Sequence, residues 1–151
     1  MNTHKKKILI MEDDRKIATA LGIRLEAAGY EVLTAADGFE GLKLTRDQHP
    51  DLIIMDIWMP VGLGFSVAQR LKSLGFAHVP VIFITASKVK GLRQTANGLG
   101  AAAFFEKPYD PEELLLAVSK ALESHSVEPD SLLAGQSGPA GQLAGSKSSL
   151  A

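Results

Sequence analysis

The chain has 151 residues, of which 46% are hydrophobic, enough for one domain with an ordinary core and a tail. It carries 16 Lys and Arg against 17 Asp and Glu, so no overall charge favours nucleic acid or an anionic membrane. The absence of cysteine excludes disulfide bonds and thiolate zinc sites and suits a reducing cytosol. The apolar run at residues 8–11 is too short for a signal peptide or a membrane span, so we expect a cytoplasmic protein without a membrane partner.

The first predicted unit joins a short strand to three consecutive acids. Residues 8–11 predict a buried strand, and Glu12, Asp13 and Asp14 follow it directly. Asp14 suits the N-cap of a helix that ends at Gly29, because apolar residues follow at helical spacing: Ile17, Leu21, Leu25 and Ala28. Glu12 and Asp13 are left without a local structural role.

The central strand ends in a single carboxylate. A strand at residues 31–35 and a helix at residues 37–49 lead to residues 52–55, a continuous aliphatic run. Because polar and apolar residues do not alternate in this run, it predicts a strand buried on both faces of a parallel sheet. Asp56 follows it, either as a cap of the next helix or as part of a ligand site, since such sites form at the carboxyl ends of strands in α/β sheets.

Two further pairs of strand and helix continue the pattern. A loop at residues 60–64, whose glycines we expect to supply backbone conformations closed to other residues, leads to a helix at residues 65–74. A strand at residues 79–84, with a proline near its start, precedes a weaker helix at residues 89–99. A fifth strand is predicted at residues 102–105.

The last helix precedes a change of composition. Asp110 suits its N-cap and Pro111 its first position, with apolar residues at helical spacing through Leu122. The chain then becomes rich in Gly, Ser and Ala, which predicts a disordered tail at residues 126–151. The alternation of strands and helices predicts one α/β domain at residues 1–125, with a doubly wound, flavodoxin-like, five-stranded parallel sheet in the order 2-1-3-4-5 and five helices.

Polar residues at the carboxyl ends of the predicted strands would meet at one edge of the sheet. They are Glu12, Asp13, Asp56, Thr85 and Lys107. Neighbouring carboxylates raise each other's pKa unless a cation joins them, and Mg²⁺ suits a sparse acidic site with room for water and a phosphate oxygen. Lys107 and Thr85 would give a phosphoryl group positive charge and a hydrogen-bond donor. Asp56 is therefore the candidate nucleophile.

These residues resemble, in order and spacing, the motif set of the receiver domains of two-component response regulators. The resemblance covers about residues 5–124 and includes five more positions: Met59 with Pro60, Gly64, Ala86 and Pro108. It implies that Asp56 is the phosphoacceptor and that Mg²⁺ is the cofactor. It further implies that Asp13 binds the metal directly, Glu12 through water, and Trp58 through its backbone carbonyl.

The resemblance also implies the residues of the switch. Thr85 and Lys107 would contact the phosphoryl group, and Lys107 and Pro108 would be joined by a cis peptide bond. Phe104 stands where the family has its switch aromatic, often a tyrosine; it can rotate inward but offers no hydroxyl. Leu63, before Gly64, departs from the acidic or polar residue that is common in the family. That departure concerns partner recognition more than chemistry.

The function implied is a signalling switch and not an enzyme with a substrate of its own. Asp56 would accept a phosphoryl group from a histidine kinase or histidine phosphotransfer protein in a Mg²⁺-dependent reaction, and the chain would assist only its own phosphorylation and dephosphorylation. The change would pass through the fourth helix, fifth strand and fifth helix to a downstream effector protein. We expect no direct contact with nucleic acid, because no output segment follows the domain; a phosphorylation-dependent homodimer stays open.

Two other functions remain open from the residues. One is a phosphohydrolase with an aspartyl nucleophile, although the dehalogenase-like kind needs a second acid two positions after the first, where Trp58 stands. The other is a phosphorylation-independent adaptor that keeps only the fold, against which the intact acid set argues. The bulk of Trp58 further suggests that it hinders water near an acyl phosphate on Asp56 and slows its hydrolysis.

Overall fold

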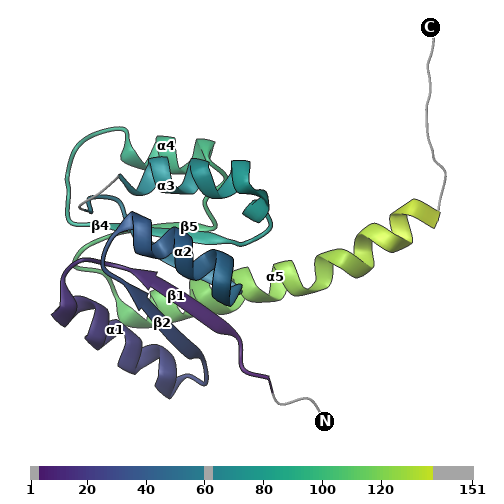
Figure 1. Cartoon of the computed structure of the whole chain (residues 1–151), viewed down its shortest axis with the longest axis horizontal. Coiled ribbons are helices and arrows are strands. Elements are labelled where there is room, and N and C mark those ends of the chain that lie inside the picture. The colour runs from purple at the N-terminus through teal and green to yellow at the C-terminus, as the bar shows by residue number, and fades with distance from the viewer. Residues whose placement is uncertain (1–3, 60–62, 138–151) are drawn as a thin grey trace, which may run out of the picture.

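A five-stranded parallel sheet with helices on both faces forms the core of the chain (Figure 1). The structure is a computed structural model and describes residues 4–59 and 63–137. Its elements, in chain order, are β1 (Lys7–Met11), α1 (Arg15–Ala27), β2 (Glu31–Ala35), α2 (Gly38–Gln48), β3 (Leu52–Asp56), α3 (Gly64–Leu71), η1 (Lys72–Phe76), β4 (Val81–Thr85), α4 (Leu92–Gly98), β5 (Ala103–Glu106) and α5 (Pro111–Ser137). The strands lie in the order β2-β1-β3-β4-β5 and all neighbours are parallel, so the predicted fold class is confirmed.

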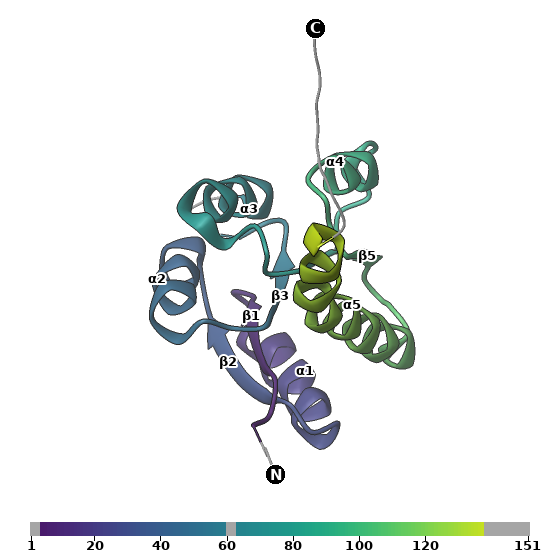
Figure 2. The same ribbon diagram turned by 90° about the vertical axis from the view of Figure 1, so that its right-hand side faces the viewer.

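Two apolar layers hold the helices against the sheet. Successive side chains of a strand point to opposite faces. Ile8 and Ile54 therefore pack with residues of α1 and α5, whereas Leu9 and Met55 pack with residues of α3 and α4. Figure 2 shows α1 and α5 on one side of the strands and α2 and α3 on the other. Strand β3 is buried along its whole length, as predicted for a strand covered on both faces.

Aspartate side chains start three helices where the sequence predicts them. The Asp14 carboxylate accepts hydrogen bonds from the backbone N–H groups of Lys16 (2.9 Å) and Ile17 (3.3 Å) at the start of α1. Asp37 and Asp110 each accept one backbone N–H in the first turn of α2 and α5, at 2.8 and 2.9 Å. Asp14 is thereby occupied as a cap, which separates its role from that of the two acids before it.

Some boundaries differ from those predicted, each for a local reason. Helix α4 begins at Leu92 and not at residue 89, because Gly91 has a left-handed φ of 89° that an α-helix does not accommodate. Strand β4 begins at Val81, directly after Pro80, which has no N–H to donate to a neighbouring strand. Helix α3 passes into the π-helical turn η1, in which Gly75 ends the helical backbone with a φ of 98°.

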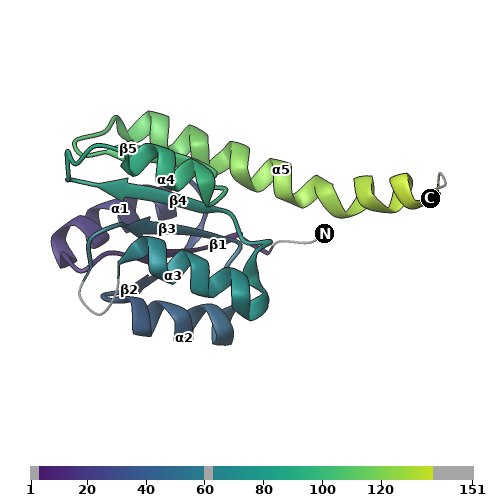
Figure 3. The same cartoon turned by 90° about the horizontal axis from the view of Figure 1, so that it is seen from above.

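Helix α5 extends further than the sequence predicts. It continues to Ser137, whereas a disordered tail is expected from residue 126 (Figure 3). The run at residues 132–134 consists of Leu, Leu and Ala, which favour helix, whereas Pro129 within the same helix disfavours it. Neither α5 nor any other helix in the described part of the chain is long and apolar enough to cross a bilayer. Residues 60–62 of the expected loop lie outside the described residues. Residues 138–151 of the expected tail also lie outside them, and the domain boundary at residue 125 stays a prediction.

Candidate functional site

The predicted site residues lie at the carboxyl edge of the sheet. Glu12 and Asp13 follow β1, Asp56 is the last residue of β3, Thr85 is the last residue of β4, and Lys107 follows β5. Because β1 and β3 are neighbours in the sheet, the acids after β1 meet Asp56 although more than forty positions separate them in sequence. The strand order thus assembles the site that the sequence predicts.

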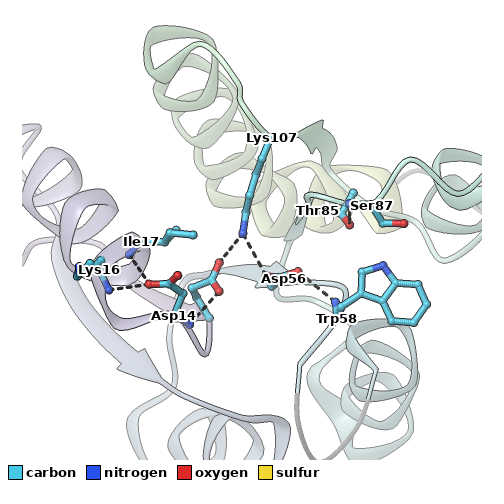
Figure 4. A network of polar contacts seen from close by, with 9 residues as sticks. Asp14, Lys16, Ile17, Asp56, Trp58, Thr85, Ser87 and Lys107 are labelled. Carbon is cyan, nitrogen blue, oxygen red and sulfur yellow. Dashed lines mark hydrogen bonds and ion pairs between the residues drawn. The ribbon is translucent and has the colours of Figure 1, made fainter.

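Lys107 joins the two buried carboxylates. Its Nζ lies 2.8 Å from Glu12 Oε1 and 3.2 Å from Asp56 Oδ2 (Figure 4). The exposed fractions of the three side chains are 17% for Lys107, 1% for Glu12 and 9% for Asp56, so these ion pairs are largely shielded from water. A charge buried to this degree is stable only with a partner, and Lys107 supplies it to both acids.

The second oxygen of each buried carboxylate accepts a backbone N–H. Glu12 Oε2 accepts from Asp14 N at 3.1 Å, and Asp56 Oδ1 accepts from Trp58 N at 3.1 Å. The dashed line from Asp56 to Trp58 in Figure 4 marks the second of these bonds. With both oxygens engaged, neither carboxylate can rotate freely, and the Asp56 carboxylate is held at the rim of the sheet.

Burial changes the protonation equilibria of the Glu12 and Lys107 pair. Loss of hydration raises the pKa of Glu12 above its ordinary value, and the hydrogen bonds from Lys107 and Asp14 oppose this only in part. Burial by itself would lower the pKa of Lys107. The hydrogen bond to Glu12 and the charge of Asp56 outweigh it, so the pKa of Lys107 is raised. Lys107 therefore keeps its positive charge at neutral pH.

The acidic residues fit a hard divalent cation. Glu12, Asp13 and Asp56 each offer one carboxylate oxygen, and these oxygens all lie within 4.8 Å of one another. Lys107 is paired with Glu12 and Asp56, and Asp13 adds a third carboxylate, so the cluster keeps an excess of negative charge that a cation would neutralise. Asp13 is exposed and can bind from the solvent side, while oxygen ligands of this kind are those that Mg²⁺ prefers.

Thr85 is buried at the end of β4, and its hydroxyl faces the following loop. Thr85 Oγ1 accepts a hydrogen bond from Ser87 N at 3.0 Å, and Ser87 Oγ accepts one from Val89 N at 3.1 Å. Two successive turns of this kind order the segment between β4 and α4. Figure 4 shows the indole of Trp58 on the same side of Asp56 as Thr85 and Ser87, and Trp58 is 46% exposed.

Lys107 and Phe104 are both placed by strand β5. The backbone N–H of Lys107 donates to Thr85 O at 2.7 Å, and the bond between Lys107 and Pro108 is cis, which confirms that expectation. Phe104 is 8% exposed, and the guanidinium carbon of Arg93 lies 4.8 Å from the centre of its ring. Arg93 carried no signal in the sequence, because nothing in a helix pattern indicates which aromatic ring an exposed arginine will cover.

Gly64 has a different role from the one predicted. The loop pattern predicts an unusual backbone conformation for it, but its φ is not in the left-handed region. A Cβ at Gly64 would instead lie 2.6 Å from the carbonyl oxygen of Asp56, and its N–H donates to Ile57 O at 2.7 Å. Gly64 is required because the start of α3 passes so close to the end of β3 that no side chain fits.

Comparison with known proteins agrees with this fold. The family described as "Response regulator receiver domain" matches residues 8–119, and the chain belongs to this family of two-component systems. The "Probable transcriptional regulator ycf27" of Cyanophora paradoxa is 40% identical over 114 residues, which are 76% of this chain and 47% of that protein. The "Alkaline phosphatase synthesis transcriptional regulatory protein PhoP" of Bacillus subtilis is 35% identical over 122 residues, 81% of this chain and 50% of that protein.

Solved structures show the same architecture. A CheY-like response regulator receiver domain protein from Methanospirillum hungatei superposes with a TM-score of 0.78 at 29% identity, covering 83% of this chain and 99% of that one. The match thus covers almost the whole of that solved chain, whereas this chain spans about half the length of the curated relatives it matches.

Proposed function

We propose that the chain is a phosphorylation switch that accepts a phosphoryl group on Asp56. The donor is a phosphohistidine of a histidine kinase or histidine phosphotransfer protein, and the reaction requires Mg²⁺. The observation that carries the proposal is the convergence of Asp56, two further acids and Lys107 at one edge of the sheet. The chain assists only its own phosphorylation and dephosphorylation, and it acts through a downstream protein.

The residues have separate tasks in this transfer. A carboxylate oxygen of Asp56 forms a bond to phosphorus while the bond from phosphorus to the donor imidazole nitrogen breaks, and the electron pair stays on that nitrogen. Lys107 provides a positive charge beside the transferred oxygens, and Thr85 provides a hydroxyl donor. Mg²⁺, when held by Asp13, Asp56 and Glu12, supplies further charge neutralisation. The Trp58 carbonyl as an additional ligand stays a prediction.

The output follows from the new charge on Asp56. Thr85 is drawn toward the phosphoryl group, which changes the face made by α4, β5 and α5. The chain thereby shifts from the arrangement of this face without a phosphoryl group to the arrangement with one. An effector protein or a second copy of the chain reads this face. The relatives named above are called transcriptional regulators, and a link to transcription through a partner or a further domain is consistent with the proposal.

One experiment separates this proposal from its two rivals. The chain is incubated with a small acyl phosphate and Mg²⁺, and its intact mass is recorded together with the phosphate released. Stoichiometric gain of one phosphoryl group supports the switch. Sustained release of phosphate from simple phosphoesters without accumulation of a labelled chain supports a phosphohydrolase. The absence of both labelling and phosphate release supports an adaptor that keeps only the fold. Either the phosphohydrolase result or the adaptor result would overturn the proposal.

Replacing the exposed acid of the cluster should weaken metal binding. In Asp13→Asn we expect the concentration of Mg²⁺ needed for half-maximal labelling to rise by roughly tenfold or more, because even outer ligands contribute that much to metal affinity. Asp14→Asn is the matched control, since asparagine caps a helix about as well as aspartate and Asp14 is already engaged with α1. An unchanged Mg²⁺ requirement in Asp13→Asn would remove Asp13 from the metal site.

Trp58 should control how long the phosphoryl group stays on Asp56. Its exposed indole follows Asp56 by two positions, and its backbone N–H already binds that carboxylate. We expect Trp58→Asn to shorten the lifetime of the phosphorylated chain roughly two- to tenfold, equal to about 0.4–1.4 kcal/mol of barrier, because water then reaches the phosphorus more easily. Leu63→Asn, an exposed apolar residue at the other end of the same loop, serves as control. Equal lifetimes for Trp58→Asn and the unchanged chain would rule out shielding by the indole.

A further inference from the structure

Arg93 links helix α4 to the aromatic side chain of strand β5. It is an exposed residue of the first turn of α4, and its guanidinium lies over the face of the buried Phe104 ring at 4.8 Å from the ring centre. A cation over an aromatic face is attracted by the negative charge density of the ring. The neighbouring residue Leu92 packs against the core layer that contains Phe104. Two successive residues, Leu92 and Arg93, therefore connect the start of α4 to the region of the Phe104 ring.

Phe104 and Thr85 share one face of the sheet. Phe104 is paired with Phe83 in the register of β4 and β5, and aligned residues of parallel strands point to the same face. Thr85 lies two positions after Phe83 and therefore points to that face as well. The space available to Phe104 thus depends on the positions of Thr85 and of the segment that leads from Thr85 to α4.

The Thr85 hydroxyl is engaged on the α4 side in this arrangement. It accepts the Ser87 N–H, and the chain then continues through Val89 and Gly91 into α4. If Thr85 turns to a phosphoryl group on Asp56 and this segment moves with it, the contact between Arg93 and Phe104 at the end of the segment would be lost or lengthened. In that case the contact opposes the movement.

We propose that Arg93 is a positioning residue whose contact with the Phe104 ring holds α4 in the arrangement described here and so sets how readily the switch responds to a phosphoryl group. The inference rests on the proposed function, since it supposes that Thr85 responds to a group on Asp56. It adds a determinant of sensitivity that lies outside the acidic cluster.

A second contact, between Lys88 and Glu106, also connects the segment between β4 and α4 to strand β5, and it can be compared with the contact of Arg93. Lys88 Nζ lies 3.4 Å from Glu106 Oε1, with 69% and 48% of the two side chains exposed. An exposed ion pair of this kind contributes little, because water screens it and two long side chains must be ordered. Lys88 and Arg93 thus carry the same charge on the same segment, but only Arg93 covers a buried ring.

The test measures the binding of beryllium fluoride, a tetrahedral phosphoryl mimic that attaches to a carboxylate oxygen, by titration calorimetry of the full chain at saturating Mg²⁺. Arg93→Met should bind it roughly two- to fivefold more tightly than the unchanged chain, the range expected for a cation over a ring at an exposed site. Arg93→Lys, which keeps the cation, should restore most of the original affinity. Lys88→Met should bind like the unchanged chain.

A double-mutant cycle with Phe104→Leu identifies the contact itself. In the Phe104→Leu background, Arg93→Met should have no further effect, because the ring that the guanidinium covers is gone. An unchanged or weaker affinity in Arg93→Met, or an equal effect with and without the ring, would refute the inference. Should Phe104→Leu fail to fold, the comparison of Arg93→Met with Arg93→Lys decides. Failure of the unchanged chain to bind the mimic would instead refute the proposed function.

Discussion

Asp56→Asn is expected to take up no phosphoryl group from a small acyl phosphate, whereas the unchanged chain gains one. The amide of asparagine has no nucleophilic oxygen comparable to that of a carboxylate, so the acyl phosphate bond cannot form at this position. Intact mass after incubation with Mg²⁺ gives the result directly.

The variant should remain folded, which makes the loss of labelling interpretable. The amide oxygen of asparagine can still accept the Trp58 N–H, and removal of one of three clustered negative charges relieves repulsion. Asp51→Asn is the matched control, since Asp51 precedes the same strand at its opposite end and accepts the Lys7 N–H at 2.8 Å. Full labelling of Asp56→Asn, or loss of labelling in Asp51→Asn, would contradict the assignment of Asp56 as the phosphoacceptor.

Gly64→Ala is expected to destabilise the fold and to distort the site together. The added methyl group would lie 2.6 Å from Asp56 O and 3.0 Å from Ile57 Cα, both rigid backbone atoms at the end of a central buried strand. Relieving this overlap requires β3 and α3 to separate, which costs about 1–3 kcal/mol of folding free energy. Chemical denaturation measures this change, and the initial rate of labelling on Asp56 should fall in the same variant because the end of β3 shifts.

The effect should depend on position and not on the loss of glycine as such. Gly98→Ala is the matched control: Gly98 is the last residue of α4, a Cβ there meets no atom within 4 Å, and its φ is not left-handed. Alanine is the better helix former, so Gly98→Ala should be neutral or slightly stabilising. If Gly64→Ala were as stable and as readily labelled as Gly98→Ala, the close approach of α3 to β3 would have no energetic significance.

Local patterns predict most of the fold because each depends on residues that are near in sequence. The aliphatic run before Asp56, the caps at Asp14 and Asp110 and the spacing of apolar residues act within one strand or one helical turn. Such patterns predict the ends of helices and strands less accurately. Gly91 delays α4 through a left-handed conformation that the periodicity does not indicate, and α5 continues to Ser137, beyond the last residue of its apolar periodicity.

The α/β class, the parallel sheet and the polar residues at the strand ends follow from the amino-acid sequence, because periodicity and strand direction suffice to place each of these residues at one edge of the sheet. Which of these residues touch one another depends on how the elements pack. Lys107 joins Glu12 and Asp56 across 95 and 51 positions, and Arg93 covers Phe104. Such contacts depend on the order of the strands and on the distance between packed elements, which no local pattern encodes. The same holds for Gly64: that this position has no room for a side chain is apparent only once α3 packs against the end of β3.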